Sequence, residues 1–245
     1  MKFSETSFKK FLNGVRGRAP VNTEMNIQNY QKALDETIAR HERAGERPTL
    51  LLHACCAPCS SYVLEYLSRF FRITVFDYNP NISPAEEFRV RTEEIKRLLS
   101  EMDFPIERPE VLVGRYDPER FYEAVRGHEN DPEGGARCEI CFRMRLTEAA
   151  TAAKAGGFDY FTTTLSISPL KNAALLNAIG KELAEVYGVP YLYSDFKKRN
   201  GYKRSIELSH EYGLYRQDYC GCVFSKRERE ARSEDGPKLS IDKNA

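Results

Sequence analysis

The seven cysteines of this sequence form three tight groups, and grouped thiols are its clearest candidates for chemistry. A lone cysteine is usually a small buried apolar residue. Groups that stand beside Gly, Pro or the end of an apolar run favour metal binding or redox chemistry instead. We predict that the fold brings all three groups to one opening. The groups are Cys55, Cys56 and Cys59, then Cys138 and Cys141, then Cys220 and Cys222.

Three kinds of thiol chemistry fit these spacings. Cys56-Ala-Pro-Cys59 follows an apolar run and has the pattern of a thioredoxin-type dithiol, but that interpretation leaves the second group without a role. Structural zinc and an iron–sulfur cluster both take four thiolates, and a position at a ligand-binding mouth favours the redox-active metal. Cys220 and Cys222, one residue apart, could close only a small strained disulfide of catalytic type, or they could supply metal ligands.

Polar residues near the cysteines extend the candidate site. His53 fits a packed or capping residue better than a ligand, and Asp77 fits a site carboxylate and a loop acceptor equally well. The hydroxyl groups at 162–168 fit strand formation and helix capping, or binding of a phosphate or a cluster sulfur. A basic segment favours contact with a phosphate backbone over a merely solvated surface. It contains Lys197, Lys198, Arg199, Lys203 and Arg204, with Tyr202 among them.

The elements that must position these residues alternate between strands and helices. Apolar or β-branched runs predict five strands, at 50–52, 73–78, 106–113, 160–165 and 190–193. Helices are predicted between them, and a C-terminal helical segment follows. This alternation favours a doubly wound, mostly parallel α/β sheet, whose ligands bind beyond the carboxyl ends of the strands. The first cysteine group follows the first predicted strand directly.

Length and composition bound the remaining possibilities. The chain has 245 residues, is 41% hydrophobic and carries a formal net charge of +1. A core is therefore available without disulfides, and any nucleic-acid contact must be local. No apolar run reaches the ~20 residues of a membrane span, and no secretory signal is visible, which predicts a reducing, cytoplasmic location. We expect a flexible extension at 1–26, one α/β catalytic domain at 27–226 and a disordered tail at 227–245.

Five motifs, in order between residues 48 and 226, together resemble the epoxyqueuosine reductases of the QueH type. Each motif alone is weakly specific, but five linked in order are a strong signal. They are His53-x-Cys55-Cys56-Ala-Pro, Arg137-Cys138-x-x-Cys141-Phe-x-x-Arg145-Leu, Thr162-Thr-Thr-Leu-x-x-Ser168-Pro-x-Lys171, Lys197-Lys198-x-x-Gly201-Tyr202 and Tyr215-Arg-Gln-x-Tyr-Cys220-Gly-Cys222.

This resemblance implies an oxidoreductase of queuosine biosynthesis. Such an enzyme reduces the epoxide of epoxyqueuosine at the wobble position of a tRNA with a GUN anticodon. Its sheet is expected to resemble that of the adenine-nucleotide alpha-hydrolase (HUP, Rossmann-like) fold. It implies a redox-active pair, Cys220 and Cys222, and it does not name the electron donor. It also implies a [4Fe-4S] cluster on Cys55, Cys56, Cys138 and Cys141.

The resemblance is also compatible with an additional mononuclear iron, for which Cys59 would be a ligand. No cobalamin-binding motif is present in the sequence. The expected substrate and RNA contacts are Lys171, Lys197, Lys198, Tyr202, Lys203 and Arg204.

Two alternatives remain open from the residues. An iron–sulfur tRNA thiolase on the same sheet would carry a Ser-Gly-Gly-x-Asp-Ser phosphate loop, but His53-Ala-Cys-Cys-Ala-Pro occupies that place. A zinc-bound RNA-binding module without catalysis would use the same thiols for structure.

Overall fold

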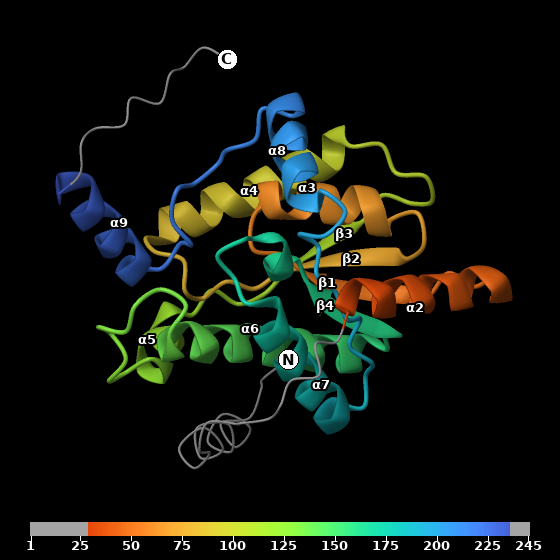
Figure 1. Ribbon diagram of the computed structural model, residues 1–245, viewed down its shortest axis with the longest axis horizontal. Coiled ribbons are helices and arrows are strands. Elements are labelled where there is room, and N and C mark those ends of the chain that lie inside the picture. Colours follow the sequence, from red (N-terminus) through yellow and green to blue (C-terminus); the bar gives the residue numbers. More distant parts are fainter. Residues whose placement is uncertain (1–28, 236–245) are drawn as a thin grey trace.

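A parallel sheet of four strands positions the cysteine groups (Figure 1). The computed structural model describes residues 29–235. The strands are β1 (Thr49–His53), β2 (Arg72–Asp77), β3 (Glu110–Val113) and β4 (Tyr160–Thr163), in the order β3-β2-β1-β4. All neighbouring pairs are parallel. The predicted α/β class is therefore confirmed.

The strand order places a topological switch point beside β1. From β1 the chain moves outward through β2 to β3, and it then returns to pair β4 with the other edge of β1. Connections leaving two such strands run in opposite directions, which opens a crevice beyond their carboxyl ends. Cys55 and Cys56 follow β1 at this point.

The predicted fifth strand is not formed, so the sheet has four strands instead of five. Only Tyr191 makes a bridge, to Phe161 of β4. Pro190 has no N–H to donate to a ladder. Other backbone groups of this stretch bind side chains, since the Leu192 carbonyl accepts from Thr162 Oγ1 at 2.8 Å and the Ser194 N–H donates to Asn177 Oδ1 at 3.0 Å.

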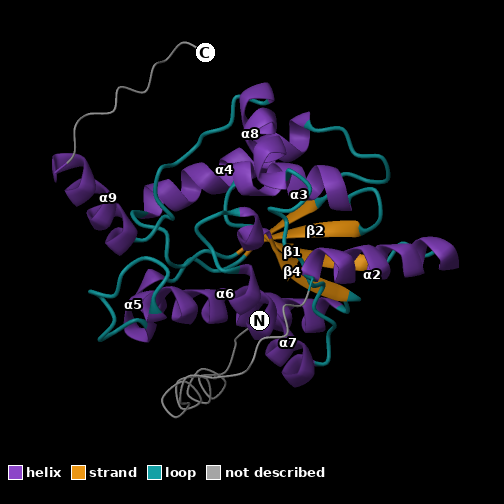
Figure 2. Ribbon diagram, viewed as in Figure 1, coloured by secondary structure: helices purple, strands orange, loops and turns teal. Residues whose placement is uncertain are grey.

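Helices cover both faces of the sheet (Figure 2). On one side lie α6 (Ala136–Gly156) and α7 (Ala173–Tyr187), and on the other lie α3 (Ala57–Leu67) and α4 (Ala85–Glu101). α8 (Gly201–Glu211) packs on α3, and α2 (Tyr30–Ala44) adds Leu34 and Ile38 to the core on the α3 side. The remaining elements are α5 (Pro118–Ala124), the 3-10 helix η1 (Thr164–Ile167) and α9 (Val223–Asp235).

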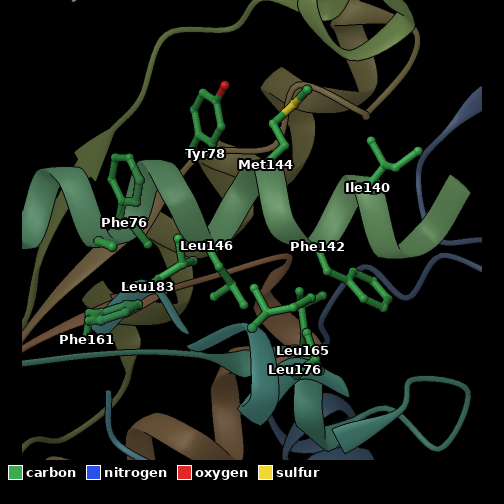
Figure 3. Packing of buried hydrophobic residues seen from close by; sticks show 14 of the residues in the cluster. Phe76, Tyr78, Ile140, Phe142, Met144, Leu146, Phe161, Leu165, Leu176 and Leu183 are labelled. Carbon is green, nitrogen blue, oxygen red and sulfur yellow. The ribbon is translucent and has the colours of Figure 1, made fainter. Parts of the chain in front are cut away.

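The alternation of side chains along β1 divides the core in two. Leu51 belongs to the cluster on the α6 side, whereas Leu50 and Leu52 belong to the cluster on the α3 side. Figure 3 shows the first cluster, which includes Phe161 of β4 and Leu183 of α7. Residues 50–53 of β1 are all buried, which explains why this strand reads as a continuous apolar run rather than an alternating one.

The ends of the domain differ from the sequence expectation at the C-terminal side. Residues 227–235, expected in a disordered tail, belong to α9, while 236–245 lie outside the described residues. Glu228 of α9 forms an ion pair with the buried Arg137 at 2.6 Å. This contact holds α9 on the domain, which explains why 227–235 are helical. The expected extension at 1–26 also lies outside the described residues. No helix in the described part is long and apolar enough to cross a bilayer.

Candidate active site

The first cysteine group forms a compact triad at the carboxyl end of β1. Cys55 and Cys56 occupy the turn, Cys56 is the N-cap residue of α3, and Cys59 lies in the first turn of that helix. The three Sγ atoms lie within 4.8 Å of one another, and those of Cys55 and Cys56 are 3.8 Å apart. Among the side chains that the structure describes, no other three His, Cys, Asp or Glu ligand atoms gather this closely.

The triad stabilises one thiolate. Hydrogen bonds from Cys56 and Cys59 lower the pKa of Cys55, and the charge of Arg145 lowers it further. The hydrogen bond with Cys55 raises the pKa of Cys56 to about 12. The pKa of Cys59 is also raised, chiefly by its hydrogen bond to Cys55. Deprotonated thiols are the form that binds metal, and soft thiolates select iron–sulfur clusters, zinc or Cu(I).

The second and third cysteine groups line one cavity of about 20 Å³. Cys138 and Cys141 come from the first turns of α6, where a spacing of three residues places both on one face. Cys220 and Cys222 come from the loop before α9, with their Sγ atoms 3.5 Å apart. This distance exceeds the ~2.05 Å of a disulfide bond, and all seven cysteines are free thiols. The other lining residues are Asn81, Phe121, Arg137, Phe142, Arg145 and Lys171.

Two cations connect the triad to this cavity. Burial disfavours the charged form of Lys171, but the negative charge of Cys220 and that of Glu133 outweigh it and raise the pKa of Lys171. The pKa of Cys220 is lowered in turn, first by a hydrogen bond from Cys222 and then by Lys171. Arg145, 4% exposed, lines the cavity and also acts on Cys55. Cys55 packs against the same apolar cluster as Cys138 and Cys220.

A buried polar network fixes Arg145 between the strands and the cavity. Its Nη2 donates to Asn79 Oδ1, and its Nε lies 3.3 Å from His53 Nε2. His53 also contacts Thr163 Oγ1 at 2.8 Å, and burial followed by the charge of Arg145 lowers its pKa to about 3. His53 is therefore a neutral, packed residue in this structure.

Asp77 is the hydrogen-bond acceptor of this network. Its two carboxylate oxygens accept from Asn79 Nδ2 at 2.5 Å and Thr92 Oγ1 at 2.6 Å, and burial raises its pKa. Of the hydroxyl groups after β4, that of Thr164 is the one that approaches the triad, at 3.4 Å from Cys55 Sγ.

The predicted RNA contacts separate into exposed and internally bound residues. Lys198, Tyr202 and Lys203 are exposed. Lys197 donates to the Ser166 carbonyl at 2.9 Å and pairs with Asp195, while Arg204 pairs with Glu65 at 2.6 Å. Lys171 lies at the cavity, where Glu133 is 3.9 Å away. The six residues thus do not form one free basic patch.

Sequence reasoning missed two residues of this region, Asn81 and Arg91. Asn81 is 2% exposed and lines the cavity, and its signal was its place in the loop that follows β2. Arg91 is 3% exposed, and its signal was a charge on the face of α4 that also buries Ile95 and Leu98.

Comparisons with known proteins agree with this geometry. The family described as "Epoxyqueuosine reductase QueH" matches residues 50–228. A protein of that name from Staphylococcus epidermidis is 43% identical over 80% of this chain and 84% of its own length. Another from Streptococcus pyogenes serotype M1 is 44% identical over 85% of this chain and 82% of its own length. A third, from Thermotoga maritima, is 37% identical over 74% of this chain and 92% of its own length. The chain therefore belongs to the epoxyqueuosine reductase QueH family.

Proposed function

We propose that this protein reduces epoxyqueuosine to queuosine at the wobble position of tRNA. The observation that carries the proposal is the convergence of two cysteine pairs, far apart in the sequence, on one cavity next to the Cys55 triad. The family membership and the names of the relatives support the same reaction. A tRNA substrate and unpaired thiols fit a reducing cytoplasm.

The donor set fits an iron–sulfur centre. We assign Cys55, Cys56, Cys138 and Cys141 to a [4Fe-4S] cluster, with Cys59 as ligand to an additional iron. The closeness of the triad and the lowered pKa of Cys55 support thiolate coordination at this end of β1. Bound there, iron would supply single electrons and Lewis acidity. The buried Arg145 and the partly buried Lys171 would offset the negative charge of the thiolates.

Cys220 and Cys222 would supply the electron pair for one turnover. The Cys220 thiolate and the Cys222 thiol together give up two electrons and form an S–S bond, which releases the proton of Cys222. The epoxide loses both C–O bonds, its two carbons form a double bond, and its oxygen takes two protons and leaves as water. The lowered pKa of Cys220 keeps a thiolate at this position, so Cys222 supplies one of the two protons and the Lys171 ammonium beside Cys220 supplies the other. An external reductant must then restore the dithiol.

The exposed residues Lys198, Tyr202 and Lys203 are the best-placed contacts for the RNA. Lysines bind phosphates, and an exposed aromatic ring stacks on unpaired bases. Because Lys197 and Arg204 are held by protein carboxylates, we assign them to shaping this surface rather than to primary phosphate binding.

Anaerobic reconstitution with iron and sulfide, followed by turnover on epoxyqueuosine tRNA, tests the function. We expect a broad visible absorption that dithionite bleaches, and conversion of the nucleoside measured by mass spectrometry. Cys138→Ala should lose the absorption, whereas Cys220→Ser should keep most of it and lose turnover. Glu139→Gln is the matched control, because Glu139 lies between Cys138 and Cys141 with a half-exposed side chain.

Three outcomes would contradict these assignments. Stoichiometric zinc without iron after anaerobic purification would favour a structural metal site. Turnover by metal-free protein would remove the cluster from the reaction. Loss of iron from Cys220→Ser would make Cys220 a metal ligand instead of a redox thiol.

A further inference from the structure

Arg91 is a buried cation that none of the motifs includes. It lies on α4, is 3% exposed, and donates through Nε to Glu87 Oε1 at 2.7 Å. Arginine is almost never buried this completely unless it is paired, and Glu87 supplies that partner one turn away. The ion pair satisfies only part of the guanidinium, which leaves other N–H groups to point toward the loop that carries the third cysteine group.

The guanidinium of Arg91 contacts two consecutive residues of that loop and leaves little space beside a third. Its Nη1 donates to the Cys220 carbonyl at 3.3 Å, and its Cζ lies 5.3 Å from the ring centroid of Tyr219. A Cβ atom at Gly221 would lie 3.0 Å from Nη1. On the other side, the Ser83 N–H donates to the Gly221 carbonyl at 2.9 Å. The Cys220-Gly221-Cys222 turn is thus enclosed between Arg91 and the loop that follows β2.

Other charged residues of α4 hold the chain that leads into this turn. Arg97 donates to the Tyr212 carbonyl at 2.9 Å, Glu94 accepts from the Tyr215 N–H at 2.7 Å, and Glu87 accepts from the Tyr215 hydroxyl at 3.2 Å. These polar contacts hold the segment 212–222 along α4, together with the burial of Leu214 in the apolar cluster on the α3 side. Arg91 is the member of this series that reaches the cysteines themselves.

We propose that Arg91 is a positioning residue that holds the Cys220–Cys222 pair in its place beside the other cysteine groups. The inference rests on the proposed function, because it gives the pair a redox role. One buried guanidinium therefore touches the backbone of the turn that carries the third group. Its loss would free the turn without removing any thiol.

Arg91→Met tests this role, with Arg89→Met as the matched control. Arg89 lies on the same helix, but it is exposed and pairs only with Glu86. We expect Arg91→Met to lower kcat on epoxyqueuosine tRNA at least about tenfold, the factor for one charge-assisted hydrogen bond, with KM changed less than about twofold. The thiol–disulfide equilibrium of the pair in glutathione buffers should shift about tenfold toward the dithiol, because a released turn lowers the effective concentration of one thiol near the other.

A purely structural role would appear differently. Arg91→Met leaves the Glu87 carboxylate without its ionic partner, which could destabilise the fold. The double variant Glu87→Gln with Arg91→Met removes that unpaired charge. It should therefore recover the thermal stability, measured by thermal denaturation, but it should not recover the thiol–disulfide equilibrium of the cysteine pair. Amide hydrogen exchange at 219–222 should be faster in both variants than in Arg89→Met. If a folded Arg91→Met protein matches Arg89→Met in kcat, thiol equilibrium and exchange, Arg91 does not position the pair. The equilibrium and exchange measurements hold even if the protein proves inactive on epoxyqueuosine tRNA.

Discussion

Replacing Gly221 by alanine tests the placement of the cysteine turn directly. Gly221 has φ +113°, a conformation that side-chain-bearing residues rarely adopt, and a Cβ there would lie 2.9 Å from Ile82 Cγ1. The backbone strain costs about 1–3 kcal/mol. Pushing the buried neighbours apart costs a further ~1–3 kcal/mol. We therefore expect Gly221→Ala to lower the free energy of unfolding by roughly 2–6 kcal/mol if the turn keeps its place.

Gly188→Ala is the control for the backbone alone. Gly188 also has a positive φ, +71°, but a Cβ there would meet no atom within 4 Å. Its cost is about 1–2 kcal/mol, with no steric part. The difference between the two variants isolates the contact with Ile82 and Arg91, and it corresponds to a Tm lower by roughly 2–12 °C for Gly221→Ala, measured by thermal denaturation.

The turn could instead relieve the overlap by moving. Tm would then resemble that of Gly188→Ala, but the alkylation rate of Cys220 and the turnover on epoxyqueuosine tRNA would change, because the pair would leave its place beside Lys171 and Arg91. Equal Tm, equal alkylation rate and equal turnover in the two variants would refute the description of this turn.

Four further substitutions test other contacts. Gly180→Ala should destabilise the protein in urea denaturation by about 1–3 kcal/mol, since a Cβ would lie 2.5 Å from the Tyr191 ring; a gain would show that the two do not pack as described. The hydrogen bond from Arg97 holds the pKa of Glu94 below its usual range. The ionised Glu94 therefore stabilises the fold at pH values above the usual carboxyl pKa, and this stabilisation is lost as the pH falls through the lowered pKa of Glu94. Glu94→Gln should therefore reduce Tm at neutral pH and narrow the difference between neutral and acid Tm, and an unchanged difference would oppose this. Lys198→Ala should reduce the salt slope of tRNA binding by about 0.7–0.9, and Arg204→Ala, whose guanidinium is held by Glu65, by less; equal slopes would contradict the surface assignment.

Much of the fold followed from local patterns. The run Leu50–Leu52 predicted a buried strand because a strand covered on both faces needs apolar side chains at every position. Asn29 caps the start of α2 with its side chain, and Gly45 ends that helix in the left-handed conformation. Such signals act over a few residues, so they can be read without knowing what lies across the core. The stretch 190–193 shows their limit, because beyond one bridge to Phe161 of β4 its backbone binds side chains and does not continue as a strand.

The sequence by itself determined which residues are the candidates for chemistry, because thiols at those spacings have few other uses, and it determined the α/β class. Only the tertiary structure decided how they are grouped. It placed Cys141 and Cys222 on one cavity, and it bound Arg204 to Glu65 rather than leaving it free. These outcomes depend on strand order and on helices that meet across large sequence separations. Contacts of that range arise from packing the whole core, which no local pattern of residues specifies.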